Sequence, residues 1–239
     1  MRTHFQAVVN GANGNVTLEN TTSRFGRTIV SATGAVAAQG SDTRSAELAL
    51  RIPQGRVQDV LLLFIRAPKS PMTGFAGLHA NVLIPSGSRR FIEKIVMEGD
   101  FGVNAGQFTS GKTQNSVDKL SAKARGNDQK DDEDPSTVLS DLKGHAVMRD
   151  ATVTFTGLQF RVPGALAKMH GTYNLETERI NLRGMLFLEQ KLSKTTSGVK
   201  SFLLKALDPL LKKNKKGGAK MPVKITGTYS HPHYSTDPI

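Results

Sequence analysis

A period-two alternation of apolar and polar residues recurs along this chain and constrains its fold more than any other feature. One run shows it clearly, with four apolar residues set against two charged ones: Ala46, Leu48, Leu50 and Ile52 against Glu47 and Arg51. Successive side chains of a strand point to opposite faces, so this run predicts a half-buried strand. The pattern repeats at residues 95–103, 151–156, 180–188 and 223–229. The chain is therefore predicted to be mostly β.

Turn signals separate these runs at short intervals. They include Asn10-Gly11, Asn13-Gly14, Pro85-Ser86-Gly87 and Gly217-Gly218, and the 23 glycines are spread over the whole chain. Such spacing favours hairpins over helical crossovers, because parallel strands need long connections. We therefore predict one antiparallel sheet instead of an α/β sandwich.

Four segments depart from the alternation. Residues 56–66 are either a short apolar helix or a buried strand, which periodicity alone cannot distinguish. Residues 113–124 predict a helix, because Val117, Leu120 and Ala124 recur at helical spacing. Asp134-Pro135 is typical of a helix start and leads into Val138, Leu139 and Leu142. The longest predicted helix covers residues 197–213.

These elements divide the chain into three regions. Residues 1–126 are predicted to be sheet with the helix near 113–124, and residues 127–144 an acidic loop followed by a short helix. Residues 145–239 are predicted to continue the same sheet, with the helix at 197–213 and a closing strand at 221–230. The acidic run at 128–134 could bind calcium, but it lacks the ordered spacing of a calcium loop, so we interpret it as a solvated loop.

The formal net charge of +12 is concentrated near the C-terminus. Residues 191–239 contain ten lysines and two acids, which gives ten minus two, or +8. The predicted helix there has an apolar arc that includes Val199, Phe202, Leu203, Leu207, Leu210 and Leu211. A basic cluster follows it: Lys212, Lys213, Lys215, Lys216 and Lys220.

Two roles stay open for this helix. It either caps the open end of the sheet or lies on an anionic membrane surface. Nucleic acid is not an expected partner, because the basic region lacks arginine and interleaved aromatic residues.

No constellation of catalytic residues stands out. The chain has no cysteine, which excludes disulfides and cysteine-ligated metals. His231 and His233 are two residues apart but have no third ligand, so no metal site is predicted. Two Ser-x-x-Lys matches, at 116–119 and 197–200, lack the companion motifs of serine acyl-transfer enzymes. We predict a protein without enzymatic activity and without cofactors.

Several strings share a glycine-punctuated pattern. The last, residues 221–237 (MPVKITGTYSHPHYSTD), carries a Pro-initiated strand, a Gly-Thr pair, and then a Pro, an aromatic residue and an Asp: Pro222, Gly227, Thr228, Pro232, Tyr234 and Asp237. Residues 99–126, 162–175 and 180–205 have related patterns. From about residue 24 onward, this ordered series resembles the C-terminal region of the AsmA-like family of bacterial lipid-transport proteins.

The resemblance implies a strongly curved antiparallel sheet whose apolar groove carries phospholipid acyl chains between the inner and outer membranes of Gram-negative bacteria. It implies a periplasmic protein anchored to the inner membrane by an N-terminal helix outside this sequence, which makes the chain a fragment. The partners implied are phospholipids, an anionic membrane surface and envelope proteins. Every second residue of a strand lies on the same face, and this alternation gives the expected groove lining as Ile95, Met97, Phe101, Val153, Phe155, Leu182, Leu186 and Ile225. The alternative is a structural or assembly module of the envelope that conducts no lipid.

Overall fold

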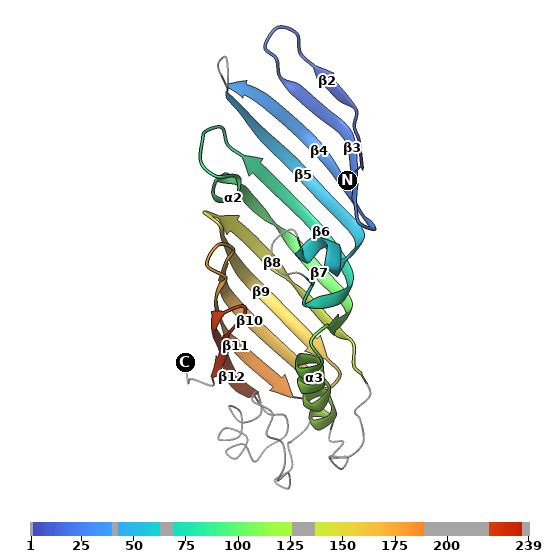
Figure 1. Cartoon of the computed structure of the whole chain (residues 1–239), viewed down its shortest axis with the longest axis vertical. Helices are drawn as coiled ribbons and strands as arrows, with labels where there is room; N and C mark the ends of the chain where they lie inside the picture. The colour runs from blue at the N-terminus through green and yellow to red at the C-terminus, as the bar shows by residue number, and fades with distance from the viewer. Residues whose placement is uncertain (1, 40–42, 63–68, 126–136, 189–219, 236–239) are drawn as a thin grey trace.

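One antiparallel sheet dominates the computed structural model, which describes residues 2–39, 43–62, 69–125, 137–188 and 220–235 (Figure 1). Its thirteen strands are β1 (Arg2–His4), β2 (Ala7–Val9), β3 (Val16–Phe25), β4 (Thr28–Gln39), β5 (Thr43–Arg56), β6 (Met72–Ile84), β7 (Val96–Phe108), β8 (Ser140–Arg149), β9 (Thr152–Val162), β10 (Ala165–Asn174), β11 (Arg179–Leu188), β12 (Lys220–Thr228) and β13 (Pro232–Ser235). The predicted mostly β, antiparallel architecture is confirmed.

The strands follow one another across the sheet in chain order. Each strand from β3 to β12 pairs with the next one, and β1 and β2 both pair with β3. The sheet is not closed, because β1 and β2 lie at one edge and β13 at the other (Figure 1). Such a meander needs only short connections, as the spacing of the turn signals predicts.

The β8–β9 connection, like those of β3–β4 and β9–β10, is a two-residue hairpin turn. Arg149 and Thr152 are direct cross-strand partners, so only Asp150 and Ala151 make the turn. Both have positive φ angles, 48° and 55°. Two consecutive positive φ values define the hairpin turn whose twist matches that of the strands.

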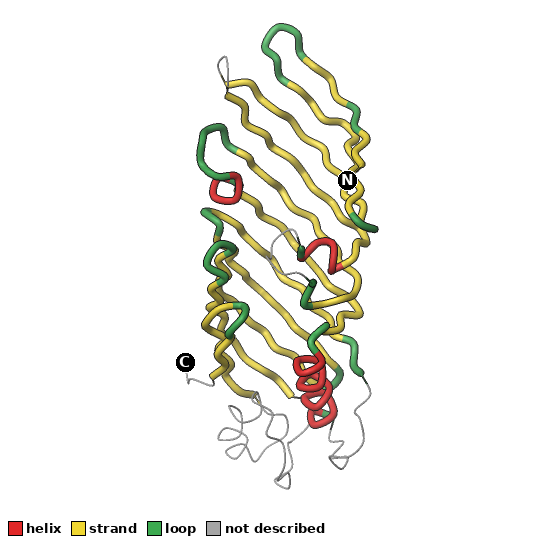
Figure 2. The backbone as a smooth tube through the Cα atoms, in the orientation of Figure 1, coloured by secondary structure: helices red, strands yellow, loops and turns green. Residues whose placement is uncertain are grey.

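Three short helices lie at the ends of the strands (Figure 2). They are α1 (Val57–Leu61), α2 (Phe91–Lys94) and α3 (Gly111–Ala124). Figure 2 shows α2 near the left ends of the strands and both α1 and α3 towards their right ends. Within the described part of the ambiguous segment 56–66, Arg56 ends β5 and α1 is helical, and α3 confirms the helix predicted near 113–124.

A buried hydrogen-bond network fixes α1 to the β3–β4 hairpin. Oδ2 of Asp59 accepts hydrogen bonds from the Arg27 amide and the Thr28 hydroxyl, both at 2.9 Å. Thr28 is fully buried, and its hydroxyl oxygen accepts a bond from the Arg56 amide at 2.8 Å. Asp59 lies in the first turn of α1, where a carboxylate is also favoured by the helix dipole.

The helix predicted to begin at Asp134 is wrong in its described part. Residues 137–139 are not helical, and Leu142 lies in strand β8. Leu142, Ala146 and Met148 are spaced by even numbers, which is strand periodicity, whereas Val138, Leu139 and Leu142 taken alone also fit helical spacing. The predicted boundary at residue 144 therefore falls inside a strand of one continuous sheet.

Other predictions lie outside the described residues. These are the acidic run at 128–134, the helix at 197–213 with its apolar arc, the Ser197–Lys200 match, and the basic cluster apart from Lys220, which begins β12. The closing strand predicted at 221–230 corresponds to β12. None of the helices in the described part is long and apolar enough to cross a membrane.

Candidate functional site

The candidate site is one face of the sheet, the apolar face, on which side chains from successive strands form continuous cross-strand rows. The central row crosses ten strands, β4 to β13, and every member is apolar or glycine except the last: Ala32, Leu50, Ala80, Gly99, Ala146, Phe155, Gly171, Leu182, Ile225 and Tyr234. On β3 the partner of Ala32 is Thr21, so a polar side chain lies at each end of the row. Because side chains alternate between faces, a one-residue slip at any strand would interrupt this row.

Two further rows run parallel to the central row. On the α2 side, the row contains Ala7, Leu18, Gly34, Leu48, Val82, Met97, Met148, Val153, Tyr173, Ile180, Gly227 and Pro232. On the α3 side, it contains Ala76, Val103, Leu142, Phe160, Ala167, Leu186 and Met221. In these two rows, the Tyr173 hydroxyl is the single polar side-chain group.

The structure brings the predicted lining residues onto this face. Phe155, Leu182 and Ile225 belong to the central row, Met97 and Val153 to the α2-side row, and Leu186 to the α3-side row. Phe101 lies on β7 between Gly99 and Val103 and packs on Phe155, with ring centroids 5.9 Å apart. Ile95 ends α2 and packs beside Met148 and Val153.

Exposure changes along the apolar face. Met148 and Met221 are each 1% exposed, whereas Val9, opposite Val16 at the β2 edge, is 64% exposed. Leu182 and Ile225 are half-buried. The face is therefore tightly packed around β8–β12 and open to solvent near β2.

Glycines on this face allow neighbouring strands to approach closely. A Cβ atom at Gly184 would lie 2.0 Å from the carbonyl oxygen of Lys168, and one at Gly99 would lie 2.2 Å from that of His79. Gly34 and Gly171 would meet backbone oxygens at 2.0 Å and also have positive φ angles. Real Cβ atoms do not occupy such positions, so these four sites require glycine.

The helices cover the two ends of the apolar face. On one side, Ile92 of α2 and Leu175 pack with Met148 and Val153. On the other, Val57 of α1 packs with Met72 and Ala76, while Val117 and Ala124 of α3 join the cluster that contains Leu186 and Met221. The central row joins these clusters: Ala146 belongs to the cluster of Met148 and Val153, and Phe155, Leu182 and Ile225 pack against the cluster of Leu186 and Met221.

A set of buried polar side chains clamps α3 in place. Oδ1 of Asp118 accepts hydrogen bonds from the Val138 amide and the Gln114 side-chain amide, both at 2.8 Å. Oε1 of Gln114 accepts a bond from the Phe108 amide at 2.7 Å. The Ser121 hydroxyl donates to the Pro163 carbonyl oxygen at 2.7 Å. Sequence reasoning missed this clamp, because its partners lie up to 42 residues away along the chain.

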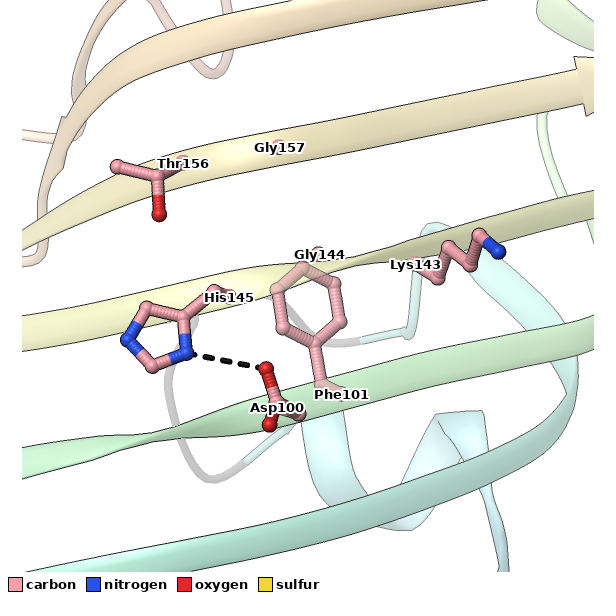
Figure 3. A pocket seen from close by; sticks show the side chains of 7 residues that line it. All are labelled: Asp100, Phe101, Lys143, Gly144, His145, Thr156 and Gly157. Carbon is pink, nitrogen blue, oxygen red and sulfur yellow. Dashed lines mark hydrogen bonds and ion pairs between the residues drawn. The ribbon is translucent and has the colours of Figure 1, made fainter.

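The opposite face of the sheet is polar and carries a shallow depression of about 400 Å³ (Figure 3). The pairing of β8 and β9 is irregular at the depression. Gly144 and Gly157 line it at this point and contribute no side chain that could fill it. His145 lies across from Asp100, with Nδ1 3.0 Å from Oδ1, and its Nε2 is 3.5 Å from Oε1 of Glu98. No serine or cysteine lines the depression. We interpret this arrangement as surface ion pairing.

The remaining chemical candidates stay apart from the apolar face. Ser116 and Lys119 lie on α3. His231 lies in the β12–β13 turn, where Nδ1 is 3.0 Å from the Ser230 hydroxyl, and His233 lies on β13. Among the described residues, no group of three His, Asp or Glu side chains could hold a metal ion.

Tyrosines mark the α2-side and β13 ends of the apolar face. Burial raises the pKa of Tyr173, and the charges of Glu178 and Tyr229 raise it further. Burial also raises the pKa of Tyr229 and of Tyr234. The Tyr173 hydroxyl is buried, and it has no hydrogen-bond partner among the described residues.

Comparison with known proteins gives no relative: no family model, no curated protein and no solved structure matches the chain.

Proposed function

We propose that the apolar face is a groove that binds phospholipid acyl chains, and that the chain acts in lipid transport as part of AsmA-like envelope machinery. The observation that carries this proposal is the central row, which crosses ten strands with no polar side chain before Tyr234. An acyl chain that lies along such a row loses contact with water and meets no side-chain hydrogen-bonding group.

The openness of the face near β2 supports an entry for the acyl chain. Val9 on this face is 64% exposed, and Phe5, between β1 and β2, is 68% exposed. Exposed apolar residues that adjoin a buried apolar row are typical of a ligand-binding groove or an interface. In this proposal the protein works in the periplasm, between the membranes that supply and receive the lipid.

A structural or assembly module is the second candidate function. It is favoured by the complete burial of Met148 and Met221 and by the helices packed over both ends of the face. In that case the chain's own side chains fill the space that the first proposal gives to lipid, and the exposed surface recruits envelope partners.

Extraction of lipid from the purified protein separates the two candidates. The protein is expressed in bacteria and purified without detergent, and its extracts are analysed by mass spectrometry; we expect stoichiometric phospholipid. Leu182→Asp places a charge on the half-buried central row, and we expect this variant to stay folded and lose the lipid. Asn181→Asp adds the same side chain to the other face of β11 and serves as the control.

The scaffold proposal predicts a different pair of results. Wild-type protein would contain no lipid, and Leu182→Asp would unfold globally, because the charge would enter a filled core. Circular dichroism of both variants distinguishes loss of lipid from loss of fold.

A further inference from the structure

The polar face of strands β9 to β13 contains no acidic residue. Their sequences include no Asp or Glu, whereas the earlier strands carry Glu19, Glu47, Glu98, Asp100 and Asp141. Exposed basic side chains occupy this part of the polar face: Arg161, Lys168, Arg183 and Lys220. The result is a uniformly positive surface on β9–β12.

None of these four side chains forms an ion pair within the described part of the chain, and the nearest acidic neighbour across the strands is Asp141 of β8, which lies opposite Arg161. The ion pairs found there join Arg89, Arg90 and His145 to carboxylates. Lys168 and Lys220 instead lie on Phe187, each with its ammonium nitrogen 5.6 Å from the ring centroid. Uncompensated charge of one sign attracts a partner of the opposite sign.

Apolar side chains lie among the basic ones. Leu166, Met185, Phe187 and Pro222 share the polar face with them, and all four are half-buried. Leu166 pairs with Phe187, which in turn pairs with Lys220, and Met185 lies between Lys168 and Pro222. An apolar centre with a basic rim matches the interface of an anionic bilayer, where apolar groups enter the headgroup region and ammonium groups remain at the phosphates.

We propose that this cationic patch, formed by Arg161, Lys168, Arg183, Lys220 and the four apolar residues, docks on the surface of an anionic phospholipid bilayer. Nucleic acid fits the patch less well, because a base stacks only on an uncovered aromatic ring. The ammonium groups of Lys168 and Lys220 already lie over the ring of Phe187. The patch lies on the face opposite the candidate groove. The proposal therefore does not depend on acyl-chain binding.

Binding to vesicles of phosphatidylcholine with about one-third phosphatidylglycerol tests the charge of the patch. Each basic residue near such a surface contributes about 1 kcal/mol, or about fivefold in partition coefficient. The double variant Lys168→Gln/Lys220→Gln should therefore bind about 25-fold more weakly. The control Arg24→Gln/Arg51→Gln removes two charges from the polar face of β3 and β5 and should bind within about twofold of wild type.

Tryptophan fluorescence tests the position of the patch independently of charge and folding yield. The chain contains no tryptophan, so Phe187→Trp would carry the only indole. We expect its emission to shift to the blue when anionic vesicles are added, and the emission of Phe75→Trp, an exposed polar-face site on β6, to stay constant.

Several results would overturn the proposal. They are equal weakening in both double variants, constant emission from Phe187→Trp, failure of the wild type to bind anionic vesicles, or tighter binding to a single-stranded oligonucleotide at the same ionic strength. Loss of lipid from the groove by Leu182→Asp with unchanged vesicle binding would show that the two faces act separately.

Discussion

At the residue scale, glycines on the apolar face determine how closely neighbouring strands approach. Gly184 is the clearest case, because no positive φ angle is involved and the obstacle is the Lys168 carbonyl oxygen, which cannot rotate away. Alternation along β11 predicts that Gly184 lies on the apolar face, together with Leu182 and Leu186. It could not show that a strand backbone lies 2.0 Å from the missing Cβ, because that contact depends on the local shape of the sheet.

Gly184→Ala should destabilise the protein by about 2 kcal/mol or more, because the added methyl group forces β10 and β11 apart. The matched control is Gly102→Ala on β7, where the nearest atom to a new Cβ is 3.8 Å away. That variant should stay within about 0.5 kcal/mol of wild type. Urea denaturation measures both, and equal midpoints for the two variants would contradict the steric account.

Ionisation of Tyr173 should destabilise the folded protein at alkaline pH. Its pKa is raised in the folded state, so between the unfolded value of about 10 and the folded value the folded protein binds more protons than the unfolded chain. The contribution of protonated Tyr173 to the free energy of unfolding is fully present below about pH 10 and is lost as the pH rises through the folded pKa.

Tyr173→Phe removes both the titrating group and a buried hydroxyl without a hydrogen-bond partner among the described residues. At pH 7 we expect it to match wild type or exceed it by about 1 kcal/mol or less, and above pH 10 its advantage should grow. Urea midpoints measured at pH 7, 9 and 11 provide the test. A constant difference across this range would refute the proposed role of ionisation.

At the element scale, α3 is held by hydrogen bonds as well as by apolar contacts. Asp118 is 2% exposed and satisfies two donors, one on the segment before β8 and one on its own helix. The helix was predictable from the spacing of Val117, Leu120 and Ala124. Its docking was not, because the backbone groups of Val138 and Pro163 that bond Gln114, Asp118 and Ser121 are brought close only by the completed sheet.

Asp118→Ala should cost about 2–3 kcal/mol, since it leaves the buried Val138 amide without its acceptor and removes one of the two acceptors of the Gln114 side-chain amide. Asn115→Ala, on the exposed side of the same helix, should change stability by less than about 0.5 kcal/mol. The comparison uses unfolding midpoints in urea. If Asp118→Ala were as stable as Asn115→Ala, the clamp would not be what holds α3.

The strand predictions are confirmed where apolar residues alternate over a long run. The prediction is wrong at the start of β8, where the helical pattern rests on only three apolar residues. β5, β7, β11 and β12 follow from alternation alone. The start of β8 resembles a helix in sequence, because Val138 and Leu139 before the strand and Leu142 within it also fit helical spacing. Only Ala146 and Met148, further along the strand, distinguish the two periods.

At the scale of the whole molecule, the two faces of one open sheet divide the proposed roles. The apolar face is assembled from strands β2 to β13, and its composition was predictable from parity. Two features required the structure: the alignment of single residues into rows across ten strands, and the separation of basic from acidic residues on the polar face. Cross-strand neighbours are distant in sequence, so alternation predicts a face but not a row.

Site-specific photocrosslinking tests the central claim most directly. A benzoylphenylalanine residue is introduced on the apolar face at Phe155, Leu182 or Ile225, and on the polar face at the adjacent positions Thr154, Asn181 and Thr226, which lie outside the cationic patch. The protein is irradiated in cells labelled with radioactive phospholipid precursors. An acyl-chain groove predicts phospholipid adducts at the three apolar-face positions and none at their neighbours. Adducts at neither set, or equally at both, would contradict it.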